Sequence, residues 1–205
     1  KGRWLVAAGL AANGWAMTLP YISLGLLLPQ IRQSFPMSDT EAGWLGSSFT
    51  LGNVIIIVPV AAWFSRQNPW RLTVIAVMLG AGATFLHAFA AGFWVLLFAR
   101  LGVGASVALR TPARALLTHR CFSVSEVPLV FGVVMASTGA AEFAALYGAP
   151  ILADITGGWR GVYHVYGAVG AIITLGWIVV GKRHKWMGFE DLADSGRAPL
   201  RAVLR

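Results

Sequence analysis

Three arginines interrupt a stretch of sequence that is otherwise free of charged residues. Arg100, Arg110 and Arg114 all fall between Phe93 and Thr118. At about 100° per residue of an α-helix, Arg100 lies within about a quarter-turn of the other two, so the three form one basic stripe. A guanidinium stays protonated at physiological pH, and its planar fork binds carboxylates through paired hydrogen bonds. This pattern predicts anion binding, with Arg100 and Arg110 as candidate substrate-binding residues.

The next uncharged stretch contains a single acidic residue, Glu142. A buried carboxyl takes up a proton more readily than an exposed one, which makes Glu142 a candidate for proton coupling. The structural alternative is a permanent ion pair between Glu142 and Arg100. Arg114, and to a smaller extent Arg110, has an alternative to anion binding: a long side chain near a membrane surface can extend its charge to water.

A polar strip lies nearer the N-terminus, where Asn13, Met17, Pro20 and Tyr21 fall within about a quarter-turn of one another. Asn13 and Tyr21 are further candidates for substrate binding, beside Arg100. The alternative is hydrogen bonding between helices, which is common in membrane proteins.

Composition predicts an integral membrane protein in contact with the lipid bilayer. Of 205 residues, 57% are hydrophobic and 12% are charged, whereas a soluble domain is about one quarter charged. The net charge of +8 is distributed between apolar stretches, so we expect no nucleic-acid partner. A single cysteine, Cys121, excludes a disulfide framework or a cysteine metal cluster. Enzyme motifs are missing too, so we expect no catalytic residues, no metal and no cofactor.

Gaps between charged residues predict an all-α fold with six membrane-spanning helices. About 20 apolar residues are needed for each crossing. Ala90-Ala91-Gly92 is the expected turn between the third and fourth spans. The expected spans within the domain 1–181 are 4–29, 42–65, 72–91, 93–118, 127–153 and 161–181.

Lysine and arginine in the short loops predict that both termini are cytoplasmic. Arg66 and Arg71 lie in one inner loop, while the outer loops keep only Arg32 and Arg160. Residues 182–205 are predicted to be a cytoplasmic tail or the start of a linker to a missing second half. The expected location is the plasma membrane or a bacterial inner membrane.

The fourth span resembles a helix of the Major Facilitator Superfamily. The shared features are Arg100, Gly104 and Pro112, with three residues between the first two and seven between the last two. The segment 158–163 (Gly-Trp-Arg-Gly-Val-Tyr) is similar to the start of that family's sixth helix. In the loop between the second and third spans only Arg66 and Arg71 match the family's gating signature, since Ser65 replaces its aspartate.

This resemblance implies that the chain is the N-terminal half of a carrier built from two six-helix halves. Each half consists of two inverted three-helix repeats, and the substrate lies between the halves. Helices one and four would line the cavity, and helices two and five would face the other half, with Glu142 near that seam. Helices three and six would be peripheral, which leaves His87 and His164 as structural, interfacial residues. The partner half belongs either to the same longer chain or to a second copy.

The function that follows is secondary active transport of a small solute by alternating access, with an organic anion as substrate and proton symport as the coupling. A six-helix scaffold or sensor without transport is the alternative, and it requires the permanent Arg100–Glu142 pair. A drug or cation efflux carrier is a lesser alternative. Gly139, Gly148 and Pro150 are similar to the antiporter pattern, but the contiguous Gly-Pro of that pattern is absent.

Overall fold

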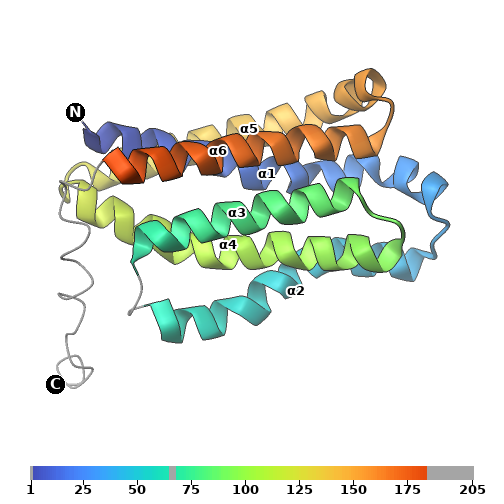
Figure 1. Ribbon diagram of the computed structural model, residues 1–205, viewed down its shortest axis with the longest axis horizontal. Helices are drawn as coiled ribbons and strands as arrows, with labels where there is room; N and C mark the ends of the chain where they lie inside the picture. The colour runs from blue at the N-terminus through green and yellow to red at the C-terminus, as the bar shows by residue number, and fades with distance from the viewer. Residues whose placement is uncertain (1, 65–67, 184–205) are drawn as a thin grey trace.

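Six long helices make up most of the described chain. The computed structural model describes residues 2–64 and 68–183 (Figure 1). Each helix is long and apolar enough to cross a bilayer; the shortest has 20 residues, a length of about 30 Å. The prediction of six helices of membrane-spanning length is confirmed. The helices are α1 (Gly2–Ser34), α2 (Asp39–Phe64), α3 (Pro69–Ala88), α4 (Phe93–Cys121), α5 (Val127–Thr156) and α6 (Trp159–Arg183).

Several helices continue past the expected spans. α1 ends at Ser34 rather than Pro29, and α6 ends at Arg183 rather than Gly181. The expected limits were set by charge and hydropathy, and a helix can extend beyond the hydrocarbon region, where polar side chains and water satisfy its ends. The predicted tail, 182–205, lies outside the described residues from 184 onward.

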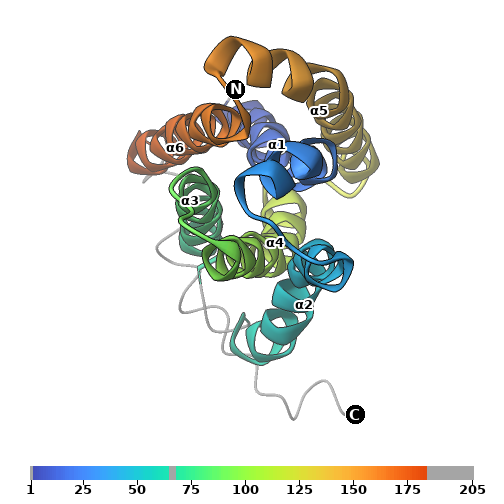
Figure 2. The ribbon, with the colours of Figure 1, turned by 90° about the vertical axis from the view of Figure 1, so that its right-hand side faces the viewer.

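The six helices form two interlocked groups of three. Figure 2 shows α1 beside α5 and α6, and α4 beside α2 and α3. The two groups also contact each other through α3 and α6. In sequence, α1–α3 form one triplet and α4–α6 the other. The first helix of each triplet, α1 or α4, therefore packs against the second and third helices of the other triplet, as expected of an inverted three-helix repeat. α2 and α5 are the least buried of the six helices.

Backbone contact between α2 and α4 depends on two glycines. A Cβ atom on Gly104 would overlap the carbonyl oxygen of Phe49, and one on Gly52 would overlap the carbonyl of Leu101. Small residues permit this approach, which is a common way to pack membrane helices in the absence of a hydrophobic driving force. The contact holds α2 firmly against the segment of α4 that carries Arg100.

Hydrogen bonds between nearby residues stabilise the turns before and after α5. Gly157 and Gly158 have positive φ angles of 78° and 125°, and the N–H of Gly158 donates to the carbonyl of Ala153 at 2.7 Å. This left-handed turn requires glycine and ends α5. Before α5, the backbone N–H of Ser123 and then its hydroxyl donate to Glu126, which also pairs with Arg3 at 2.9 Å. These contacts lower the pKa of Glu126 below its ordinary value.

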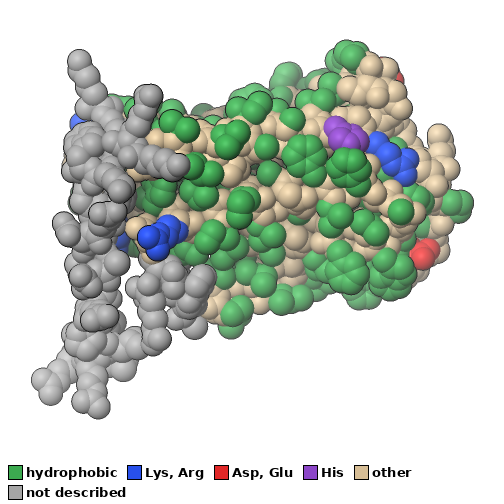
Figure 3. Space-filling view, in the orientation of Figure 1, with side chains coloured by type: hydrophobic (Ala, Val, Ile, Leu, Met, Phe, Trp, Pro, Cys, Tyr) green, Lys and Arg blue, Asp and Glu red, His purple; other side chains and the backbone are tan. Residues whose placement is uncertain are grey.

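Apolar side chains cover the middle of the bundle. On the face shown in Figure 3, charged side chains lie near the two ends and hydrophobic ones lie between them. α1 begins and α6 ends at the same end of the bundle (Figure 1). The even number of antiparallel crossings accounts for this, and the cytoplasmic location of that end stays a prediction.

Candidate functional site

Arg100 is buried in the bundle and bonded to the backbone of α1. Its side chain is 2% exposed. Nη1 donates to the carbonyl of Pro20 at 3.1 Å, and both Nη1 and Nη2 lie 3.4 Å from the carbonyl of Tyr21. The two helices are therefore connected through a charge-assisted contact between residues about eighty positions apart.

Two aromatic rings enclose the same guanidinium. The Arg100 Cζ atom lies 5.5 Å from the ring centre of Tyr21 and 5.8 Å from that of Phe49. These rings contact each other at 4.2 Å between centroids. Tyr21 is 41% exposed, so it lies between the buried arginine and the surroundings of the bundle. Such contacts stabilise a cation by about 0.5–2 kcal/mol, depending on its desolvation.

The other two arginines of the stripe have buried N–H groups without hydrogen-bond partners. Arg110 is 9% exposed, and its buried Nε and Nη1 atoms have no hydrogen-bond partner. Arg114, one turn away, is half-buried; its guanidinium lies 5.6 Å from the ring of Phe131 on α5, and its Nε is also unpartnered. A buried cation without a partner is costly, so this pair of arginines favours an anionic ligand.

The structural alternative, an ion pair between Arg100 and Glu142, is wrong. Across residues 2–64 and 68–183, the ion pairs are Arg3–Glu126 and Arg32–Asp39, and both lie at the ends of helices. Glu142 is exposed on α5, while Arg100 bonds to α1. α4 and α5 touch only slightly, because α1 separates them over most of their length. The basic stripe therefore has no carboxylate from the described part of the chain.

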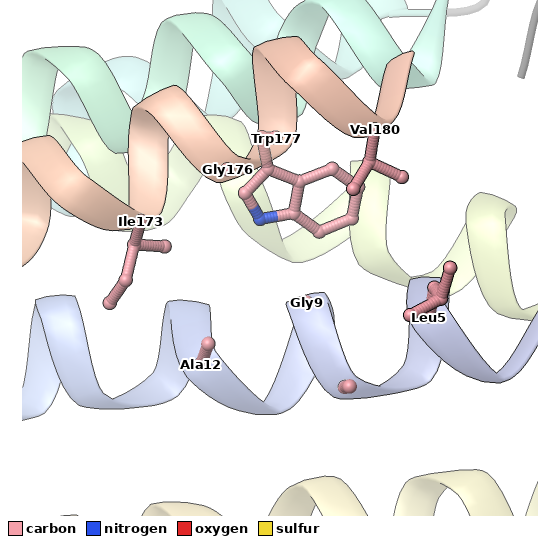
Figure 4. Close-up of a pocket in the computed structure, with 8 residues that line it drawn as sticks. Leu5, Gly9, Ala12, Ile173, Gly176, Trp177 and Val180 are labelled. Atoms are coloured by element: carbon pink, nitrogen blue, oxygen red, sulfur yellow. The ribbon is translucent and has the colours of Figure 1, made fainter. Parts of the chain in front are cut away.

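Asn13 does not lie with Arg100 and Tyr21. It is fully buried against α6, where its Oδ1 accepts a 2.5 Å hydrogen bond from Trp177 Nε1. Trp177 also lines an apolar pocket of about 260 Å³ between α1 and α6. Figure 4 shows its ring in that space, with Gly9 and Ala12 on the facing helix. None of the pocket's lining residues is charged, so it does not suit an anion.

The remaining predicted residues lie apart from this site. Gly104 is buried at the α2–α4 contact, and Pro112 lies within α4. Arg71 is exposed near the start of α3, whose N-cap Asn68 accepts a hydrogen bond from the N–H of Trp70 at 2.9 Å. Arg66 lies outside the described residues, so the gating role of Arg66 and Arg71 stays a prediction.

Sequence reasoning missed three residues around Arg100. Phe49 comes from α2, His87 from α3 and Tyr163 from α6. His87 was expected at the membrane interface, and this is wrong: it is 0% exposed and stacks on Tyr163 at 4.7 Å between ring centres. Its position near the end of α3 suggested contact with water, but α6 covers it. His164 is exposed.

Comparison with known proteins assigns the family. Residues 4–205 match the family model described as the Major Facilitator Superfamily. The chain belongs to this superfamily of membrane transporters. It is therefore a multi-pass membrane protein of a transporter family and not an enzyme. The resemblance carried by Arg100, Gly104 and Pro112 predicted this family.

Two relatives support this assignment. The chain is 25% identical over 175 residues to the "Uncharacterized transporter YybO" of Bacillus subtilis, covering 84% of this chain and 40% of that protein. It is 28% identical over 166 residues to the "Probable L-galactonate transporter" of Escherichia coli, covering 77% of this chain and 35% of that protein. The chain thus spans less than half the length of these relatives.

Solved structures show the same fold. A bacterial homologue of the human lysosomal transporter Spinster, inward-facing and unoccupied, matches with a TM-score of 0.82 and 21% identity. The match covers 88% of this chain and 43% of the other. The occupied form gives a TM-score of 0.81. At this identity the comparison establishes the six-helix arrangement alone.

Proposed function

We propose that this chain forms one half of a secondary carrier that moves a small organic anion across a membrane by alternating access. The observation that carries the proposal is the buried basic stripe of α4. Arg110 keeps two buried N–H groups without partners, and no carboxylate of the described chain neutralises the stripe. In a low-dielectric setting such groups bind anions strongly.

The proposed site follows the α4 stripe, with Arg110 at one end and Arg100 and Tyr21 about 15 Å away at the other, so that a small solute meets the two ends in succession. Arg100 is fixed by two carbonyls and two rings, so it presents a preorganised charge. Tyr21 is exposed beside it and can contact the solute. Asn13 is not included, because its side chain faces Trp177.

A sugar acid is the proposed class of solute. A relative carries the name "Probable L-galactonate transporter", and galactonate combines a carboxylate with several hydroxyl groups. Arginine suits the carboxylate, and Tyr21 suits a hydroxyl. A cationic drug would meet repulsion at this stripe, so the efflux alternative is disfavoured. The scaffold alternative required a permanent Arg100–Glu142 pair, and it loses that support.

Proton symport is a further part of the proposal, with Glu142 as the carboxylate candidate. Glu142 is exposed on α5, one of the two least buried helices. This placement fits a seam with a second six-helix half, supplied by the same longer chain or by a second copy. The proposed location is the plasma membrane or a bacterial inner membrane.

The experiment is uptake by the complete protein in proteoliposomes, with L-galactonate and neutral galactose compared side by side. We expect accumulation of the acid when the outside is more acidic than the lumen, and little uptake of galactose. R110M, which removes the charge and keeps the length of the stem, should lose uptake. Equal uptake of both sugars, or of the acid by R110M, would overturn the proposal.

A further inference from the structure

A polar cavity of about 550 Å³ lies at the end of the bundle where α1 and α5 end and α6 begins. Figure 2 views the bundle from this end. The lining residues fall between 30 and 34 in α1 and between 153 and 160 around the α5–α6 turn. Small-molecule sites in proteins have volumes of about 300–1,000 Å³. The cavity therefore has the size of a ligand site, and it lies apart from the arginine stripe, because no residue of α4 lines it.

The level of this cavity is that of the lipid headgroups. Its residues on α1 follow Pro29, where the first expected span ends, and most of the others lie between the fifth expected span and the sixth. Ser34 is five residues beyond Pro29, a rise of about 7.5 Å. The polar layer on each side of the hydrocarbon core is about 5–8 Å thick. A ligand in the cavity would therefore lie among headgroups.

Hydrogen bonds fix the wall of the cavity where α1 and α6 meet. The buried Trp159 donates from Nε1 to the hydroxyl oxygen of Ser34 at 3.0 Å, and that hydroxyl donates to the carbonyl of Gln30 at 3.2 Å. Nη2 of Arg160 donates to the carbonyl of Ala90 at 3.1 Å, and its Cζ atom lies 4.5 Å from the ring centre of Trp159. The guanidinium is thus held in place beside the cavity.

Two opposite charges line the cavity without forming an ion pair. They are the exposed side chains of Asp154 and Arg160, and neither belongs to an ion pair within residues 2–64 and 68–183. The Oε1 atom of Gln30, also in the lining, is buried and has no hydrogen-bond partner. Most buried polar atoms in proteins are bonded, so this oxygen requires an N–H or O–H donor. The cavity therefore matches a ligand with an anion, a cation and a hydrogen-bond donor.

We propose that this cavity binds the headgroup of a phospholipid with a primary amine, phosphatidylethanolamine. The phosphate pairs with Arg160, and the ammonium lies at Asp154 and donates to Oε1 of Gln30. A primary ammonium has N–H donors, whereas the quaternary ammonium of phosphatidylcholine has the same charge and none. The site therefore distinguishes these two lipids by hydrogen bonding rather than by charge.

A sugar acid suits this cavity less well than the stripe of α4. It has hydroxyl donors and a carboxylate, but it has no positive charge to pair with Asp154. The lipid inference is also independent of the proposed transport, because Arg100, Arg110 and Tyr21 do not line the cavity.

The first experiment is native mass spectrometry of the complete protein in detergent with four lipids at equal concentration. They are phosphatidylethanolamine, its N-methyl and N,N-dimethyl derivatives, and phosphatidylcholine, all with the same acyl chains. The charge is constant across this series, while the N–H donors are lost one by one. We expect retention to fall along the series, by about tenfold from first to last. Equal retention of the four lipids would overturn the proposal.

Variants of the lining residues assign the preference to this cavity. We expect Q30M, which removes the acceptor and keeps the length of the side chain, and D154N each to retain the four lipids nearly equally. D39N is the matched control, because Asp39 is exposed near the end of the bundle where α1 ends and does not line the cavity. Thermal melts without lipid check that the variants are folded. A preference for phosphatidylethanolamine that persists in both Q30M and D154N would contradict the assignment.

Soluble ligands distinguish the source of the headgroup and separate this inference from the proposed transport. If O-phosphoethanolamine raised the melting temperature of a protein that retained the four lipids equally, a free solute would be the ligand, and the lipid proposal would be overturned. Displacement of bound phosphatidylethanolamine by L-galactonate would assign the cavity to the transported solute and would overturn it as well. A retained lipid preference without any binding of L-galactonate would refute the proposed solute alone.

Discussion

The two ends of the α4 arginine stripe differ in the hydrogen-bond partners that the protein gives to each guanidinium. Arg100 bonds to two carbonyls of α1 and lies against the rings of Tyr21 and Phe49. Arg110 is similarly buried, yet two of its N–H groups have no partner, and its neighbouring charge is another arginine. The same residue type on one helix therefore serves two purposes: Arg100 is a fixed, preorganised charge, and Arg110 is a charge that requires a ligand.

The largest expected difference between the two sites is in their tolerance of lysine. R100K loses the planar fork that reaches both carbonyls, and we expect uptake of L-galactonate to fall about tenfold or more, since a charged hydrogen bond contributes about 1.5–3 kcal/mol. R110K keeps a charge where the structure shows no fixed geometry, and we expect a loss of only a few-fold. Uptake into proteoliposomes by the complete protein measures both. Equal losses in the two variants would remove the distinction.

Stability provides a second contrast, with effects of opposite sign. R100M deletes bonded interactions between α4 and α1, so we expect a lower melting temperature in detergent without substrate. R110M deletes a buried, unpartnered charge, so we expect a melting temperature that is unchanged or higher. The loss in R100M is of the order of 1–3 kcal/mol. Differential scanning fluorimetry measures both melting temperatures. A lower melting temperature for R110M than for R100M would show that Arg110, and not Arg100, stabilises the fold.

A substitution at Gly104 can disturb the packing around Arg100 without changing the surroundings of Arg110. A Cβ atom there would overlap the carbonyl oxygen of Phe49, whose ring covers Arg100. We expect G104A to cost about 1–3 kcal/mol through overpacking. The control is G82A, on an exposed position of α3 where a Cβ would meet nothing within 4 Å. Unfolding followed by tryptophan fluorescence compares the two, and equal stabilities would show that the α2–α4 contact is not tight.

The smallest effect is expected at the Arg110 end of the bundle, where Glu126 bonds to Ser123 and pairs with Arg3. Because folding lowers its pKa from the ordinary value of 4.5, Glu126 stabilises the fold above that value, and this contribution is lost as the pH falls through the lowered value. E126Q should therefore melt slightly below the parent at pH 7 and converge with it in acid. The exposed position keeps the difference small. A difference that grows on acidification would contradict the sign.

The helices and the basic stripe could be predicted from the sequence because both depend on spacing along one segment. Gaps between charges identified six spans, and helical periodicity placed Arg100 and Arg110 on one stripe. Tyr21 was expected near Arg100 from the family resemblance, and it lies there. The spans and the stripe required no knowledge of how the helices rotate against one another, whereas the placement of Tyr21 came from the family resemblance alone.

The contacts between helices could not be predicted in this way. Asn13 and Tyr21 share a stripe of α1 but lie about two turns apart along it. Asn13 meets Trp177 on α6, while Tyr21 meets Arg100 on α4. His87 was misplaced as well, since Tyr163 on α6 covers it. The Arg100–Glu142 pair also failed, because adjacency in sequence does not make α4 and α5 neighbours in this bundle.

The most direct measurement is the affinity of the complete protein for L-galactonate, determined by calorimetry for the parent, R110M and R120M. Arg120 is an exposed arginine in the last turn of the same helix, so it controls for net charge. We predict that R110M binds about tenfold or more weakly than the parent, and that R120M binds like the parent. Equal affinities in all three proteins would contradict anion binding by the α4 stripe.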